Sequence, residues 1–135
     1  MQQATYQQQA YRRTQIETAQ PGRVLLSLYD EALRLVRLAE QQIRSGDVPG
    51  KGRSLSKAHA IISEFINALD YAVAPGLCSN LERIYLFMID GITIANLQMD
   101  AAPLGTVTVH LEALREAWVA AVNEVAVENS KRDAT

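Results

Sequence analysis

The chain has 135 residues, a formal net charge of −2 and a single cysteine, Cys78. This length is typical of one domain, and it suffices to bury a core without a metal or a disulfide. The charge does not favour a nucleic-acid or anionic-membrane partner, and one cysteine excludes an internal disulfide, which fits a reducing cytosol.

The two ends of the chain are polar and weakly patterned. The Gln-rich residues 1–17 are expected to form a mobile N-terminal arm, and they contain no apolar run of the kind that a signal peptide needs. Residues 129–135 predict a disordered tail. The folded domain is therefore expected over residues 18–128.

The first predicted helix begins at Pro21, because proline is tolerated in a first helical turn, where its missing N–H has no partner. Apolar residues then recur at spacings of three and four as far as Ile43, and Gly46 is suited to end the helix. These positions cover more than half of the circumference. Tyr29 falls at the margin of this arc and Asp30 on the polar side, so we expect a core-edge tyrosine, with its hydroxyl satisfied near the surface, and a solvated carboxylate.

The second predicted helix begins between Asp47 and Ser54, since either side chain is competent to cap it. The sequence VAPG at residues 73–76 breaks it. Its apolar face consists of Leu55, Ala58, Ile61, Ile62, Phe65, Ile66 and Leu69.

The third predicted helix, from about Ser79 to Met99, is apolar nearly all round, so it must be covered on several sides. Its most apolar stretch, residues 85–99, is too short to cross a bilayer and too polar at Asp90, Asn96 and Gln98, because a span needs about 20 mostly apolar residues. One coherent stripe faces the core and consists of Leu81, Ile84, Tyr85, Met88, Ile92, Ala95 and Met99. Four further apolar residues lie outside that stripe, namely Leu86, Phe87, Ile94 and Leu97.

The fourth predicted helix carries a cleaner core stripe of Leu111, Leu114, Trp118, Val122 and Val125. The preceding TVTVH, residues 106–110, alternates like a strand, but one isolated short strand would have nothing to pair with, so we favour helix. Four amphipathic helices with short connections predict an all-α protein, an antiparallel four-helix bundle. The surplus apolar residues of the third helix are then either extra core or a surface for a partner.

The sequence gives little sign of catalytic chemistry. It has no Glu-x-x-His pair of the kind that binds two metals in a helical bundle, and no glycine-rich phosphate loop, so we expect no enzyme activity, no metal and no cofactor. His59, in the middle of a predicted helix, leaves a histidine phosphotransfer bundle as the alternative. Such domains place a lysine and a small residue one turn later, whereas Ile62 and Ser63 occupy those positions, and an exposed helix histidine is favoured.

Several strings, in order, resemble the flagellin-export chaperone family FliS. AYRRTQIETAQPGRVLLSLYDEAL resembles the start of that family, with its tyrosine, its short segment before a proline, and Leu-Tyr-Asp followed by Ala-Leu. GDVPGKGRSLSKAHAII resembles the start of its second helix. SNLERIYLFMIDGITIANLQMD resembles its third helix, and LEALREAW its end. The resemblance covers about residues 10–122.

The resemblance implies a helical bundle that binds the disordered C-terminal segment of newly made flagellin in the bacterial cytosol. The bound segment cannot polymerise prematurely and is handed to the flagellar type III export gate. The resemblance further implies that the N-terminal arm lies over part of the binding surface when flagellin is absent. We expect Tyr11 and Ile16 of this arm to dock against the bundle. The partner-binding residues are then expected among these two and Leu86, Phe87, Ile94 and Leu97. A monomer or a weak homodimer is expected, and a structural homodimer remains an alternative use of the surplus stripe.

Overall fold

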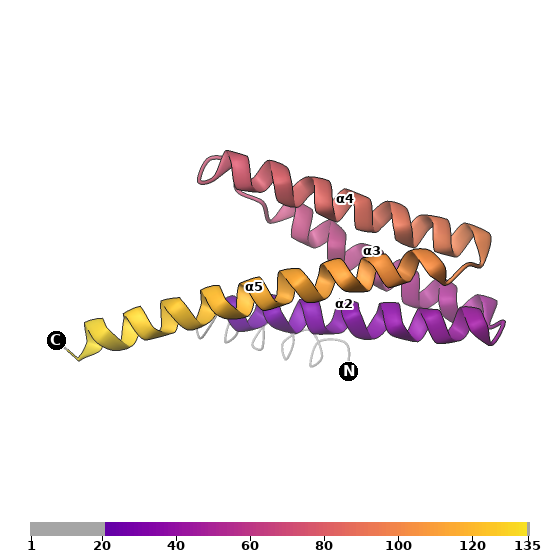
Figure 1. The fold of residues 1–135 in the computed structure, drawn as a ribbon, viewed down its shortest axis with the longest axis horizontal. Coiled ribbons are helices and arrows are strands. Elements are labelled where there is room, and N and C mark those ends of the chain that lie inside the picture. The colour runs from indigo at the N-terminus through magenta and orange to yellow at the C-terminus, as the bar shows by residue number, and fades with distance from the viewer. Residues whose placement is uncertain (1–20, 135) are drawn as a thin grey trace, which may run out of the picture.

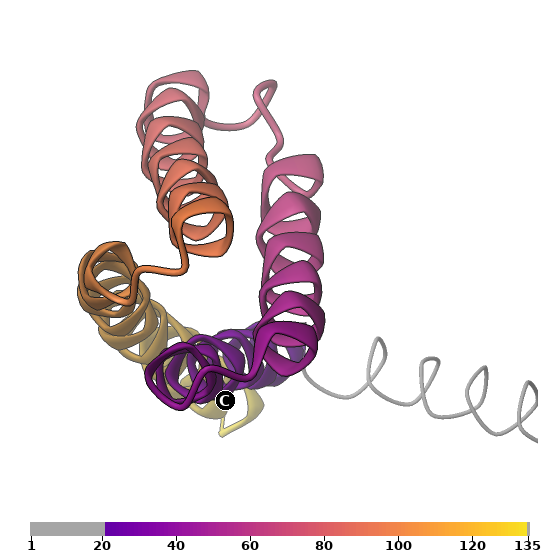
Figure 2. The ribbon, with the colours of Figure 1, turned by 90° about the vertical axis from the view of Figure 1, so that its right-hand side faces the viewer.

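The computed structural model describes residues 21–134, and these form a bundle of antiparallel helices (Figure 1). Each helix packs against the next one along the chain, and the last closes the bundle by packing against the first (Figure 2). The predicted all-α four-helix bundle is therefore confirmed, while the expected arm over residues 1–17 lies outside the described residues. The helices are α2 (Pro21–Arg44), α3 (Val48–Asn67), α4 (Pro75–Gln98) and α5 (Ala102–Asp133).

The turn between α2 and α3 follows the predicted chemistry. Gly46 adopts a positive φ of 77°, a conformation that glycine reaches without a steric penalty. Asp47 then caps α3, because its carboxylate accepts a hydrogen bond of 3.0 Å from the backbone N–H of Gly50. Of the two caps that the sequence allowed, Asp47 is the one used, and Ser54 lies buried inside the helix.

The start of α4 differs from the prediction. We expected it near Ser79, but the helix begins at Pro75, which occupies the first turn, where a missing N–H costs nothing. The Cys78 thiol donates a hydrogen bond of 3.3 Å to the carbonyl of Asp70, which ties this first turn to the preceding loop. The α3–α4 connection is accordingly residues 68–74. At its other end α4 is capped by Met99 in the left-handed conformation, with a φ of 52°.

Helix α5 includes residues 106–110, so the choice of helix over strand for TVTVH is confirmed. The disordered tail that we predicted from residue 129 is wrong within the described residues, because α5 continues to Asp133. No glycine or proline follows Gly105, so the sequence has no residue that would break the helix earlier. Its last turn also carries two basic side chains, which the negative end of the helix dipole favours.

The core contains the predicted stripe of α4 and a tyrosine that we had placed at its edge. Tyr29 is fully buried, with 0% of its surface exposed, and its ring stacks on Phe65 at a centroid distance of 4.4 Å. The core-edge prediction is therefore wrong. Asp30 is solvated, as expected, with 56% of its side chain exposed, and it also forms an ion pair of 2.5 Å with Arg115 of α5. The burial of Tyr29 and the pairing of Asp30 both arise because α5 packs against this turn of α2, which single-helix periodicity does not reveal.

Candidate partner-binding surface

The four surplus apolar residues of α4 are all substantially exposed. The exposed fractions are 46% for Leu86, 53% for Phe87, 44% for Ile94 and 80% for Leu97. These four residues are therefore not part of the core in the isolated chain. Their predicted role in binding a partner is a separate question.

These side chains share one face of α4. At 3.6 residues per turn they fall within an arc of about 100°, on the side opposite the buried stripe. The middle of the same arc carries Arg83 and Asp90, so the face is apolar but not uniformly so. The result is an apolar surface on the outside of the bundle, made by adjacent turns of one helix; we call it the α4 outer face.

On the α5 side, this face continues across the helix boundary. The ring of Phe87 meets the ring of His110 edge to face, at a centroid distance of 5.5 Å and an angle of 85°. Helices α4 and α5 approach closely here because Gly91 has no side chain; a Cβ at this position would lie 3.0 Å from Val107 Cγ2.

On the α3 side, Leu97 forms one wall of a shallow pocket of about 230 Å³ between α3 and α4. Its apolar lining comes from Leu55, Ile92 and Leu97, and its polar lining from Ser56, His59, Thr93 and Asn96. A partner on the α4 outer face could therefore place a side chain into the seam beside it.

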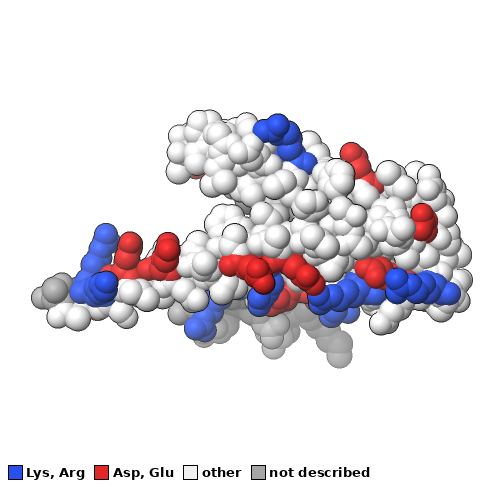
Figure 3. All heavy atoms as spheres, viewed as in Figure 1, with Lys and Arg blue, Asp and Glu red and all other residues white. Residues whose placement is uncertain are grey.

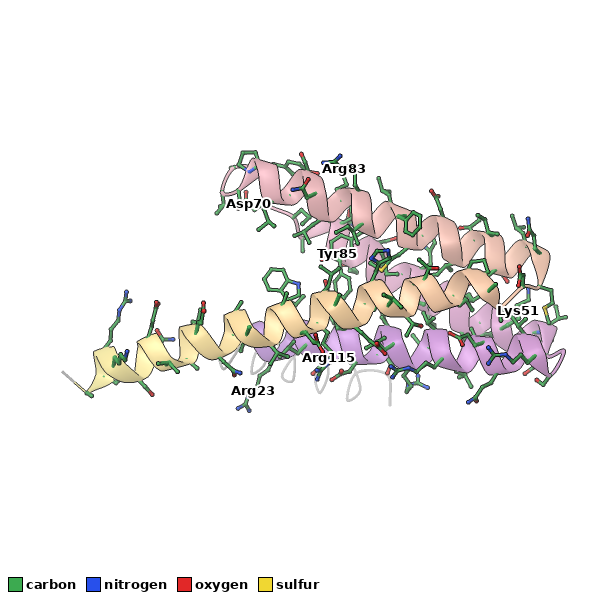
Figure 4. All side chains as sticks on the ribbon, in the orientation of Figure 1. Arg23, Lys51, Asp70, Arg83, Tyr85 and Arg115 are labelled. Atoms are coloured by element: carbon green, nitrogen blue, oxygen red, sulfur yellow. The ribbon has the colours of Figure 1, made fainter. Side chains whose placement is uncertain are left out.

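Lys51 holds the two helices together at the end of this pocket, and sequence reasoning missed it. The side chain is almost fully buried, and its ammonium donates hydrogen bonds of 2.6 Å to both the backbone carbonyl and the side-chain oxygen of Asn96 (Figure 4). The ammonium thus satisfies a carbonyl in the last turn of α4 and benefits from the helix dipole.

The seam between α2 and α5 is chemically different, because charged side chains bridge it. Arg37 pairs with Glu112, and Asp30 pairs with Arg115. Figure 3 shows blue and red atoms gathered along this boundary, whereas the surface between α4 and α5 is mostly white. An apolar partner would have to desolvate these charges, so this seam is a poorer docking site than the α4 outer face.

A buried polar network joins three helices beneath this surface. The hydroxyls of Tyr29 and Tyr85 lie 2.7 Å apart, and the indole N–H of Trp118 donates to the Tyr29 hydroxyl at 3.2 Å. Figure 4 shows Tyr85 reaching from α4 into the space above α5. Burial raises the pKa of both tyrosine hydroxyls above their ordinary range, and their mutual hydrogen bond further raises the pKa of Tyr29. This network fixes how α4 sits on α2 and α5.

The other residues singled out in the sequence are Tyr11, Ile16 and His59. Tyr11 and Ile16, expected to dock on the bundle, lie outside the described residues. His59 is exposed on α3, with its Nδ1 atom 3.4 Å from the hydroxyl of Ser63.

No group of three His, Cys, Asp or Glu side chains in the described part of the chain is placed to hold a metal ion. None of the four described helices is both long and apolar enough to span a membrane.

Comparison with known proteins gives a consistent family. A model of the flagellar protein FliS family matches residues 1–125 of this chain. The flagellar secretion chaperone FliS of Bacillus subtilis is 32% identical over 113 residues, which make up 84% of each chain. The corresponding chaperone of Salmonella typhimurium is 33% identical over 114 residues, or 81% of this chain and 84% of the relative. That of Vibrio cholerae is 28% identical over 114 residues, or 82% of this chain and 84% of the relative.

Proposed function

This chain belongs to the FliS family of flagellar secretion chaperones, and from that premise we propose that its client is flagellin. In this proposal it binds the disordered C-terminal segment of newly made flagellin in the bacterial cytosol. Binding keeps flagellin from polymerising prematurely, and the complex is delivered to the flagellar type III export apparatus. The chain acts by binding and not by catalysis.

The observation that carries this proposal is the exposure of Leu86, Phe87, Ile94 and Leu97 on one side of α4. Soluble proteins rarely expose a contiguous apolar patch without a partner for it. Single exposed apolar residues need no explanation, but four within three turns of one helix do. A client segment that covers this face would remove the patch from water.

An amphipathic helix suits this surface better than an extended strand. The described residues are helical and offer no sheet edge to which a strand could add. A client helix can lie along α4. Its apolar side chains, spaced three and four residues apart, would contact Phe87 on one side of the α4 outer face and Leu97 on the other. The client segment would gain this structure on binding, and its ordering entropy would be offset by the apolar burial.

The test is to replace each of the four residues by serine, and to measure melting temperature and flagellin affinity for each variant. The matched control is Val127→Ser, because Val127 is a similarly exposed apolar residue on α5, away from the α4 outer face. Substitutions at exposed positions are expected to change the free energy of unfolding by less than about 0.5 kcal/mol. Loss of an apolar anchor is expected to weaken binding by more than about 1 kcal/mol at one or more of the four positions.

Two outcomes would count against the proposal. If all four serine variants bound flagellin as tightly as the control, the α4 outer face would not be the binding surface. If the chain bound no flagellin at all, the client assignment itself would be wrong.

A further inference from the structure

The shallow pocket between α3 and α4, here called the seam pocket, contains two polar side chains of α4 with defined hydrogen-bonding roles. Thr93 and Asn96 both line it, and a spacing of three residues places them on adjacent turns of the same side of the helix. Leu97 belongs both to the seam pocket and to the α4 outer face. A helix bound on that face therefore has direct access to the pocket.

Lys51 determines which end of the Asn96 amide is available to a ligand. An ammonium group only donates hydrogen bonds, so the amide oxygen must face it, and these two atoms lie 2.6 Å apart. The N–H₂ group of Asn96 then makes no hydrogen bond to another described residue. No side-chain nitrogen or oxygen in the described part of the chain is both fully buried and without a partner. The N–H₂ group is therefore accessible, and it can donate to a ligand.

The Thr93 hydroxyl supplies the complementary acceptor. Its proton is engaged, because the hydroxyl donates a hydrogen bond of 2.9 Å to the backbone carbonyl of Ile89, and its oxygen remains able to accept. The pocket thus presents one donor and one acceptor on adjacent turns of α4. The apolar walls beside them are formed by Leu55, Ile92 and Leu97.

The pocket favours a neutral ligand group. Among the described residues that line it there is no Asp, Glu, Lys or Arg. The charge of Lys51, beside the last turn of α4, is offset by the negative end of the helix dipole. A charged side chain entering the pocket would therefore lose its hydration without meeting an opposite charge.

We propose that the seam pocket binds a carboxamide side chain, asparagine or glutamine, of the client segment; the client is the flagellin of the proposed function, on which this subsite rests. A carboxamide carries an acceptor and a donor at the same end of one neutral side chain. Its carbonyl accepts from the Asn96 N–H₂ group, and its own N–H₂ group donates to the Thr93 hydroxyl oxygen. Its methylene stem lies against the apolar walls. Asn96 and Thr93 are then specificity-determining residues, and Lys51 is a positioning residue that orients Asn96.

The first test measures the coupling between Asn96 and the client. Asn96→Asp keeps the oxygen that Lys51 contacts but replaces the N–H₂ donor by a second acceptor. Peptides of the flagellin C-terminal segment, in which each Asn or Gln in turn is replaced by Asp or Glu, are titrated by calorimetry against the wild type and this variant. We expect one peptide position at which the two changes together weaken binding about tenfold or more beyond the product of their single effects, because two carboxylates then face each other.

Asn80→Asp is the matched control for this charge change. Asn80 lies on the same helix and also has its amide oxygen held by a cation, since it accepts a hydrogen bond of 2.6 Å from Arg83, but it does not line the seam pocket. At the coupled peptide position, Asn80→Asp should show no such excess. Circular dichroism and thermal melting verify that each variant is folded.

The second test separates recognition of the carboxamide from support of the fold. Thr93→Val keeps the shape of an exposed side chain and removes the acceptor, and Lys51→Met leaves the Asn96 amide unoriented. Each should weaken the unmodified peptide about two- to tenfold, the usual effect of one hydrogen bond. Neither should weaken a peptide in which the coupled amide is replaced by leucine. A merely structural role would weaken both peptides equally.

Three results would overturn the proposal: no peptide amide coupled to Asn96, an equal excess in Asn80→Asp, or a Thr93→Val variant that binds the two peptides of the second test with unchanged affinity. A segment that binds without any such coupling refutes the subsite alone. A wild type that binds no flagellin segment refutes the proposed function, and the subsite with it.

Discussion

Replacing Tyr29 by phenylalanine isolates the energetic contribution of the buried tyrosine pair. The change keeps the ring that stacks on Phe65 and removes only a hydroxyl, which contacts both the Tyr85 hydroxyl and the Trp118 indole N–H. Tyr85 is only 2% exposed, so its hydroxyl would lose its Tyr29 partner in an almost fully buried site. Leaving a buried donor unsatisfied costs about 1–3 kcal/mol. For a chain of this size that corresponds to a fall in melting temperature of about 4–12 °C.

The partner substitution makes the prediction sharper. Tyr85→Phe should cost less than Tyr29→Phe, because the Tyr29 hydroxyl would still accept the hydrogen bond from Trp118. The double variant removes both hydroxyls and leaves neither unsatisfied. It should therefore be more stable, by about 1 kcal/mol or more, than the sum of the two single effects predicts.

Urea unfolding of the wild type, the two single variants and the double variant, followed by Trp118 fluorescence and by circular dichroism, gives the four free energies of the cycle. If the two single effects simply added, or if Tyr29→Phe did not change stability, the hydrogen-bonded pair would contribute nothing measurable and the reasoning would be refuted.

Three further predictions concern stability. Met88→Ala removes a fully buried side chain and should destabilise the bundle by about 2–5 kcal/mol in urea unfolding; a loss below 1 kcal/mol would mean that the site collapses or is not core. Asp47→Ala removes the α3 cap and should cost about 1 kcal/mol, measured in the same way, while Asp47→Asn should retain most of the capping hydrogen bond and serves as the control. Burial raises the pKa of the Tyr29 hydroxyl, so this tyrosine ionises in the unfolded chain before it ionises in the folded one as pH rises. Its contribution to the free energy of unfolding should therefore be constant below about pH 10 and fall above it. The fall, measured by urea unfolding across this pH range, should be less steep in Tyr29→Phe.

The helix boundaries that depend on local chemistry were the easiest to predict. Gly46 was predicted to end α2, and Asp47 was one of the two caps allowed for α3, because both residues act through their own backbone and side-chain geometry. The start of α4 was misplaced because VAPG was interpreted only as a break, whereas Pro75 also qualifies as a first-turn residue. The end of α5 was misplaced because a polar composition was taken for disorder in a segment without any helix breaker.

The contacts between helices could not be predicted in the same way. The burial of Tyr29 and the pairing of Asp30 depend on which turn of α5 lies opposite, and periodicity within α2 carries no such information. Lys51 is satisfied by a carbonyl 45 positions away along the chain. The sequence indicated that α4 has more apolar residues than one core stripe needs. The packing of the bundle was needed to show that all four of the surplus side chains are exposed, namely Leu86, Phe87, Ile94 and Leu97.

We propose that the bundle binds the C-terminal segment of flagellin through the α4 outer face. The most direct measurement is a calorimetric titration of the full chain with flagellin, and with flagellin that lacks its C-terminal segment. We predict binding to the first and none to the second, together with a negative heat-capacity change from apolar burial. Equal affinity for the two flagellins would contradict the account, because the client would then be held through some other region.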